Sequence, residues 1–155
     1  MDYNGKLLAR ARARLAEQRE RNAAEQRRRM ELAYARLPRL RGLDRQLRMQ
    51  MIDLARLAMA RGPEARESIE RLKRENLALQ AERAELLASA GLPADYTDEI
   101  YSCPICRDTG LDGTELCSCL KKLYKRELTQ ELSGLLHGGQ ESFESFDLGW
   151  YDALP

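Results

Sequence analysis

Apolar residues recur every three or four positions in four stretches of the chain, which is the spacing of one face of a helix. In the first stretch, residues 3–36, Leu8, Ala11 and Leu15 keep this spacing before polar residues take over the same register. The middle of this helix therefore has no apolar stripe to bury, and we expect it to stand in solvent or to lie on a partner. Pro38 predicts the end of the helix.

The second stretch predicts a helix over residues 43–61, after Gly42. Gly62 and Pro63 then supply a stop and a new start, because Gly suits the position after a helix and Pro suits the first helical turn. The apolar face of this second helix is expected to consist of Leu47, Met51, Ile52, Leu54, Leu57, Ala58 and Met59.

The third stretch, residues 63–90, has the most regular pattern. Its apolar positions alternate in steps of three and four, as at the a and d positions of a coiled coil, and Asn76 takes one a position. This seam packs either against the second helix as an αα-hairpin or against a second chain, and the short turn at residues 62–63 favours the hairpin. The seam consists of Ile69, Leu72, Asn76, Leu79, Arg83 and Leu86.

The pattern changes in residues 93–119, which hold short turns and all four cysteines. A last amphipathic helix is predicted over residues 120–137. The tail, residues 140–155, contains both Phe residues and the only Trp, and predicts an irregular segment that docks on another surface. The apolar side of the last helix is expected to be formed by Leu120, Tyr124, Leu128, Leu132, Leu135 and Leu136.

The composition agrees with long solvated helices, since the chain has 26 Leu and 19 Ala but no Val. The net charge of +1 hides a division along the chain. Residues 1–92 carry 21 basic against 13 acidic side chains, and residues 93–155 carry 5 against 12. This division favours an anionic partner for the first part, or self-association of two copies head to tail.

Nothing in the sequence predicts export or membrane insertion. The first residues lack the apolar run of a secretory signal, and no stretch approaches the ~18 continuous apolar residues of a membrane span. We therefore expect a cytoplasmic protein with no membrane segment. In that compartment thiols stay reduced, and clustered cysteines more often bind a metal than form disulfides.

The cysteines form two close pairs. Two residues separate Cys103 from Cys106, one separates Cys117 from Cys119, and ten lie between the pairs. Such pairs flank the tight turns of zinc knuckles, in which the thiolates converge on one ion at about 2.3 Å. Four thiolates leave no open position for water or substrate. We therefore predict one structural Zn²⁺ bound by these four cysteines.

Three other readings of the cysteines have less support. A reactive dithiol at Cys103 and Cys106 normally lies between a strand and a helix, which the pattern does not predict. An iron–sulfur cluster has other cysteine spacings, and two disulfides need an oxidising compartment. His137 is the only histidine, and we interpret it as a polar residue near a helix C-terminus rather than a further ligand.

Together these features predict a mainly α fold. It has a long N-terminal helix and an αα-hairpin, followed by a small four-cysteine zinc knuckle and a C-terminal helix. We divide the chain into a helical arm and hairpin (residues 1–92), a zinc module with the C-terminal helix (93–139) and the tail (140–155).

The block YSCPICRDTGLDGTELCSCLKKLY, residues 101–124, resembles the zinc segment that precedes the ATPase core of bacterial DnaC/DnaI-type loaders of the replicative helicase, which are AAA+ proteins. The segments ARLPRLRGLDRQL, ENLALQAERAELLASAGLPADY and ESFESFDLGWYD agree with this family, so the resemblance covers nearly the whole chain. It implies an N-terminal domain that contacts the replicative DNA helicase and regulates access to single-stranded DNA.

The chain departs from that family in one respect. A G-x-x-x-x-G-K-[ST] loop, which cradles phosphates in such ATPases, is absent from the sequence. Nucleotide binding and hydrolysis are therefore not carried over, and we expect no enzymatic activity. On this reading the tail leads toward an ATPase domain that this sequence lacks.

Two functions remain, and the first is favoured. One is a protein-interaction module that binds the helicase. The other is a single-stranded nucleic-acid-binding module, with Arg10, Arg14, Arg21 and Arg28 of the basic first helix as candidate phosphate contacts. Aromatic residues for stacking bases are absent from that basic stretch, and acidic residues interleave with it. The basic set as a whole is Arg10, Arg12, Arg14, Arg19, Arg21, Arg27, Arg28 and Arg29.

Overall fold

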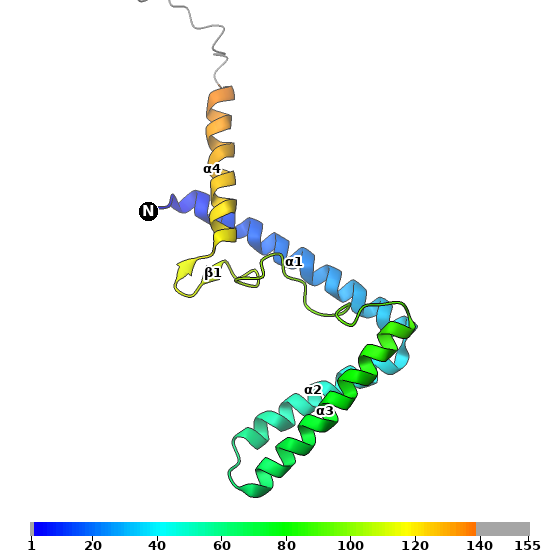
Figure 1. Ribbon diagram of the computed structural model, residues 1–155. Coiled ribbons are helices and arrows are strands. Elements are labelled where there is room, and N and C mark those ends of the chain that lie inside the picture. Colours follow the sequence, from blue (N-terminus) through cyan, green and yellow to red (C-terminus); the bar gives the residue numbers. More distant parts are fainter. Residues whose placement is uncertain (1, 139–155) are drawn as a thin grey trace, which may run out of the picture. The chain divides into compact units, whose positions relative to one another are not determined.

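The computed structural model describes residues 2–138, and the predicted tail lies outside them. Within this range the chain forms four helices and one two-stranded hairpin, so the mainly α prediction is confirmed (Figure 1). In chain order the elements are α1 (Gly5–Arg36), α2 (Pro38–Ala58), α3 (Pro63–Ser89), β1 (Leu111–Asp112), β2 (Glu115–Leu116) and α4 (Ser118–Gly138).

The fold divides into two compact units. The cysteine unit holds the chain up to Arg21 together with the chain from Tyr101 onward, and the hairpin unit holds Asn22–Ile100. Helix α1 supplies residues to both units. The division of the chain at residue 92 that the sequence suggested stays a prediction.

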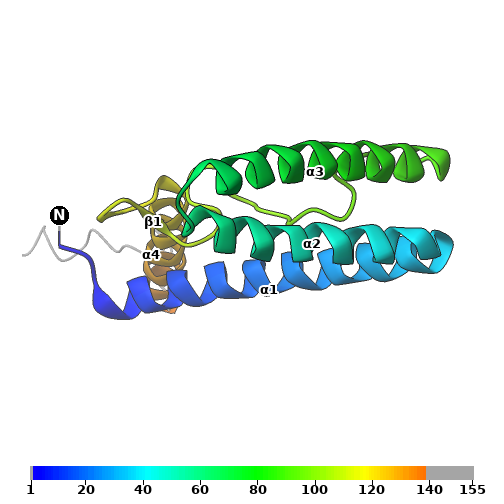
Figure 2. The ribbon, with the colours of Figure 1, turned by 90° about the horizontal axis from the view of Figure 1, so that it is seen from below.

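Helices α2 and α3 lie side by side as an antiparallel hairpin (Figures 1 and 2). The predicted start of the second helix at residue 43 is wrong, because α2 begins at Pro38 and includes Gly42. Proline at the first helical position loses no hydrogen bond and has the helical φ already fixed. The earlier start also places Leu40 and Leu43 in full burial.

The predicted apolar face of α2 is partly wrong. Met51, Ile52 and Met59 are exposed, with Met59 at 87%. The face that meets α3 starts at the buried Leu40 and Leu43 and continues at steps of three and four residues. Met51 and Ile52 lie outside these positions. This face consists of Leu40, Leu43, Leu47, Gln50, Leu54 and Leu57.

Polar contacts fix the register of the hairpin. Asn76 donates a hydrogen bond from Nδ2 to Oε1 of Gln50, 3.0 Å away, at the middle of the seam. Nearer the base, Arg83 pairs with Asp44 at 2.6 Å, and both side chains are mostly buried. Arg83 also donates to the backbone oxygen of Ala94 and to the hydroxyl of Thr97.

The base of the hairpin unit has a small apolar core. Ala33 of α1, Leu40 of α2 and Leu87 of α3 are completely buried against one another. Tyr34 lies beside this core, and its hydroxyl donates to Asp44 over 2.7 Å. The last turns of α1 therefore close one end of the hairpin.

In the cysteine unit, α4 packs across the first half of α1 (Figure 1). The core consists of Ala11 and Leu15 of α1 and Leu120 of α4. Asn4 caps α1, since its Oδ1 accepts the backbone N–H groups of the next turn. The backbone N–H of Asn4 in turn donates to the hydroxyl of Tyr124 over 3.0 Å.

None of the helices within residues 2–138 is both long and apolar enough to cross a membrane.

Candidate metal centre

The structure brings the four predicted cysteines together. Their sulfur atoms all lie within 4.8 Å of one another. The Sγ atoms of Cys103 and Cys117 are 3.8 Å apart, and those of Cys106 and Cys119 are 3.5 Å apart. Ligands about 2.3 Å from a tetrahedral ion stand about 3.8 Å from each other. The four sulfurs therefore fit around one metal ion.

The cysteines are free thiols in a protected position. Separations of 3.5 and 3.8 Å are far from the ~2.05 Å of a disulfide bond. Cys103 and Cys106 are 7% exposed, Cys117 is fully buried, and Cys119 is half-buried. The first two lie in a turn, and the other two bracket the start of α4.

The first knuckle, residues 102–110, is a tight turn around Cys103 and Cys106. The N–H of Arg107 donates to the carbonyl of Cys103 at 3.0 Å, and the N–H of Thr109 donates to the carbonyl of Cys106 at 3.2 Å. The N–H of Gly110 points at the Sγ of Cys106, 3.4 Å away. Backbone donors of this kind offset the negative charge of a thiolate ligand.

The second cysteine pair is returned to the first by a short β-hairpin. Leu111 pairs with Leu116, and Asp112 pairs with Glu115, around a turn that contains Gly113 at φ 62°. The N–H of Cys117 then donates to the carbonyl of Gly110 over 2.8 Å. This bond ties the start of α4 directly to the end of the first knuckle.

Sequence reasoning missed Asp108. Its side chain is only 1% exposed, and its carboxylate accepts the N–H groups of Ser102 and Cys103. Its φ is 62°, in the left-handed region that Asp tolerates better than most residues. An Asp within a knuckle loop was the available signal, but its burial depends on contacts that the local pattern does not reveal.

The thiols influence one another strongly. Burial acts to raise the pKa of Cys106, but hydrogen bonds from the N–H of Gly110 and from the neighbouring thiols outweigh it and lower that pKa. Burial and the same neighbours raise the pKa of Cys119. One thiolate therefore forms readily, whereas four of them at this spacing need a cation to balance their charge.

The predicted arginines already have partners in the chain. Arg10 pairs with Glu131 at 3.5 Å, and Arg14 pairs with the buried Glu127 at 3.1 Å and with Glu17 at 3.9 Å. Hence two of the four candidate phosphate contacts join α1 to acidic groups of α4 within the cysteine unit.

The other two candidates bind side chains of α1 itself. Arg21 donates to Gln18 at 2.9 Å. Arg28, in the hairpin unit, shares the carboxylate of Glu25 with Arg29. Hydrogen bonds from Arg28 and Arg29 lower the pKa of Glu25 to about 2. The four arginines are spaced four and seven residues apart along α1, and each already has a side-chain partner among the described residues.

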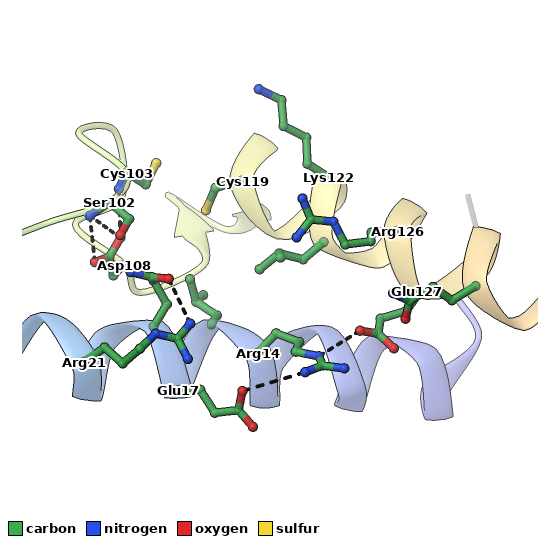
Figure 3. Close-up of a pocket in the computed structure, with 14 residues that line it drawn as sticks. Arg14, Glu17, Arg21, Ser102, Cys103, Asp108, Cys119, Lys122, Arg126 and Glu127 are labelled. Atoms are coloured by element: carbon green, nitrogen blue, oxygen red, sulfur yellow. Dashed lines mark hydrogen bonds and ion pairs between the residues drawn. The ribbon is translucent and has the colours of Figure 1, made fainter.

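A groove of about 560 Å³ runs beside the cysteine cluster between α1 and α4 (Figure 3). Cys103 and Cys119 lie at one side of it, and charges of both signs line it. The charged residues are Arg14, Glu17, Arg21, Asp108, Lys122, Arg126 and Glu127. This mixture gives the groove no clear preference for an anion.

His137 is not part of the cysteine cluster. It lies in the last turn of α4, where its Nδ1 is 2.7 Å from the carbonyl oxygen of Ser133. The cluster of potential metal ligands found among the described residues consists of the four cysteines.

Comparison of the chain with protein-family models, curated proteins and solved structures finds no match. The resemblance to the helicase loaders therefore rests on the sequence segments alone.

Proposed function

We propose that the four cysteines hold one structural zinc ion, in a non-enzymatic protein-interaction module whose partner is the replicative DNA helicase. The observation that supports the metal centre most directly is the closed set of four sulfurs within 4.8 Å. Sulfur ligands in a tetrahedral arrangement favour zinc among the common divalent ions. A polynuclear iron–sulfur cluster carries sulfides between its irons and would hold the cysteines farther apart.

The role of the ion is structural on this proposal. Four protein ligands fill the coordination sphere, so that no position remains for a substrate. Apart from the cysteines, the buried apolar residues described in the cysteine unit are Leu7, Ala11, Leu15 and Leu120, and the knuckle loop is made mainly of turns. A small unit of this kind gains most of its folding free energy from the metal. The ion would therefore hold α4 and the knuckle in place against α1.

The interaction role rests on the hairpin unit. Large apolar side chains stand exposed on α2 and α3, among them Met51 at 64% and Leu77 at 65%. A protein partner that covered these side chains would remove their apolar surface from water. Figures 1 and 2 show α2 and α3 as an antiparallel pair, so these exposed side chains belong to one packed element of the fold. The sequence resemblance supplies the identity of the proposed partner, the helicase.

Direct DNA binding is the weaker candidate. Three of the four arginines that suggested it, Arg10, Arg14 and Arg28, form ion pairs within the chain, which offset part of the positive charge that phosphates would meet. An intact chain that bound single strands tightly, with affinity falling steeply as salt rises, would favour this alternative.

The interaction proposal is tested by copurification with the replicative helicase at moderate salt. Met51→Glu and Leu77→Glu each place a charge at an exposed apolar position of the hairpin unit, and we expect each to weaken the complex at least tenfold. Ala24→Glu is the matched control, because it adds the same charge at an exposed position of the same unit. Equal binding by all three variants, or no binding by the wild type, would contradict the proposal.

A further inference from the structure

Asp108 places a buried carboxylate directly behind one of the metal ligands. Its oxygens accept the N–H of Ser102 at 2.9 and 3.1 Å and the N–H of Cys103 at 2.8 Å. A carboxylate removed from water is unfavourable unless such donors surround it, and bonds to an ionised acceptor are stronger than neutral ones. Figure 3 shows the carboxylate turned toward the backbone of Ser102.

These bonds act on the backbone of the ligand itself. The N–H of Cys103 is held by the Asp108 carboxylate, and the carbonyl of Cys103 accepts the N–H of Arg107. Both polar backbone groups of Cys103 are therefore fixed by two adjacent residues of the same loop. Because the side chain projects from this peptide, its direction toward the other three sulfurs is fixed as well.

The loop maintains this arrangement against its own backbone preferences. Arg107 and Asp108 both have left-handed φ values, 50° and 62°. For residues other than Gly this conformation is unfavourable by about 1–2 kcal/mol each. Such a conformation persists only where surrounding contacts require it. Here the hydrogen bonds that join this segment to Cys103 and Ser102 favour it.

We infer that Asp108 is a positioning residue of the metal centre, which orients Cys103 for ligation through its backbone N–H. This inference rests on the proposed metal centre and extends it to a group that does not touch the ion. Groups that orient metal ligands from outside the ligand set typically change affinity by about 10–100-fold when removed.

The test uses the full chain loaded with Co²⁺, whose thiolate charge-transfer absorption reports the sulfur ligands. Its affinity is measured by competition with a chelator. We expect Asp108→Ala to weaken cobalt binding by about 10–100-fold and to reduce the charge-transfer intensity per bound ion. Asp108→Asn should show a smaller loss, since the amide oxygen keeps one acceptor. The matched control is Asp112→Ala, an exposed aspartate of the neighbouring strand β1, which should behave as wild type.

The outcomes separate the two proposals. Wild-type chain that binds cobalt through four thiolates, together with Asp108 variants of unchanged affinity and spectrum, would overturn the role of Asp108 alone. A wild-type chain that takes up no cobalt would overturn both the metal centre and this role. Circular dichroism of each variant shows whether its helices form. Should Asp108→Ala be unfolded, Asp108→Asn decides the matter: a loss relative to Asp112→Ala supports the role, and equality overturns it.

Discussion

Gly110 lies so close to Leu15 that a Cβ atom on Gly110 would stand 2.9 Å from the Cδ2 atom of Leu15. The same Cβ would be 3.2 Å from Cδ2 of Leu120. The end of the first knuckle therefore rests on the core formed by α1 and α4, and a side chain at this position would have to displace the ends of two core leucines.

Gly110→Ala should destabilise the cysteine unit more than Gly113→Ala. Both glycines have positive φ, 81° and 62°, which is unfavourable for Ala by about 1–2 kcal/mol. Only Gly110 also faces the packed core, where overpacking adds about 1–3 kcal/mol. Chemical denaturation of the metal-loaded chain, followed by a signal from the cysteine unit, measures both. Equal losses would show that the contact with Leu15 has no energetic weight.

Breaking the pair of Arg83 and Asp44 should strongly destabilise the hairpin unit. The two side chains are 16% and 14% exposed, so Arg83→Met leaves a largely buried carboxylate without its cation. We expect a loss of about 3 kcal/mol in the free energy of unfolding, and a double variant that also carries Asp44→Leu should recover much of it.

The surface pair of Arg39 and Glu82 provides the control for this experiment. It also joins α2 to α3, but its side chains are 56% and 47% exposed. Arg39→Met should change the free energy of unfolding by less than about 1 kcal/mol. Thermal or urea unfolding of the variants gives the comparison. Similar losses of unfolding free energy for the two pairs would contradict the expectation that the buried pair matters more.

Glu25 should titrate well below an ordinary glutamate. Hydrogen bonds from Arg28 and Arg29 lower its pKa from 4.5 to about 2. Because the folded-state pKa is depressed, the favourable contribution is present above pH 4.5 and is lost as the pH falls toward 2. Carboxyl NMR titration measures this directly. Replacing both arginines by Ala should return the pKa toward 4.5, whereas Arg36→Ala, on the same helix, should leave it low.

Removal of the metal should affect the two units differently. We expect a strong chelator, or Cys103→Ser, to abolish amide protection in the knuckle and in α4, because the knuckle consists mainly of turns and the cysteine cluster joins it to the start of α4. Amides of α2 and α3 should stay protected, since their seam and their buried ion pair contain no cysteine. Hydrogen exchange read by mass spectrometry distinguishes the units. Loss of protection throughout, or in neither unit, would contradict this expectation.

The features that the sequence predicted correctly depend on local patterns. The α3 seam follows the 3–4 spacing of its apolar residues. The short spacing within each cysteine pair indicates a tight turn at that pair. The start of α2 was misplaced because Pro38 suits both a helix end and a helix start, and burial of Leu40 decides between them. Packing between helices decides which face of a helix meets which neighbour. The apolar spacing within one helix does not show this.

The polar groups buried in the fold were the hardest features to predict. Asp44 and Arg83 lie 39 positions apart in the sequence, and nothing in either helix alone indicates that they pair. Asp108 looks like an ordinary turn residue until its carboxylate is seen to accept the N–H of Cys103. In both cases the buried charge has partners that the sequence pattern does not reveal, across two helices for Asp44 and within the knuckle for Asp108.

Elemental analysis of the purified, folded chain tests directly whether the four cysteines bind one structural zinc ion. We expect about one zinc per chain, retained after dialysis and lost, together with the structure of the cysteine unit, when Cys117 is replaced by Ser. A folded chain that contains no zinc, with its four thiols free to react, would contradict it.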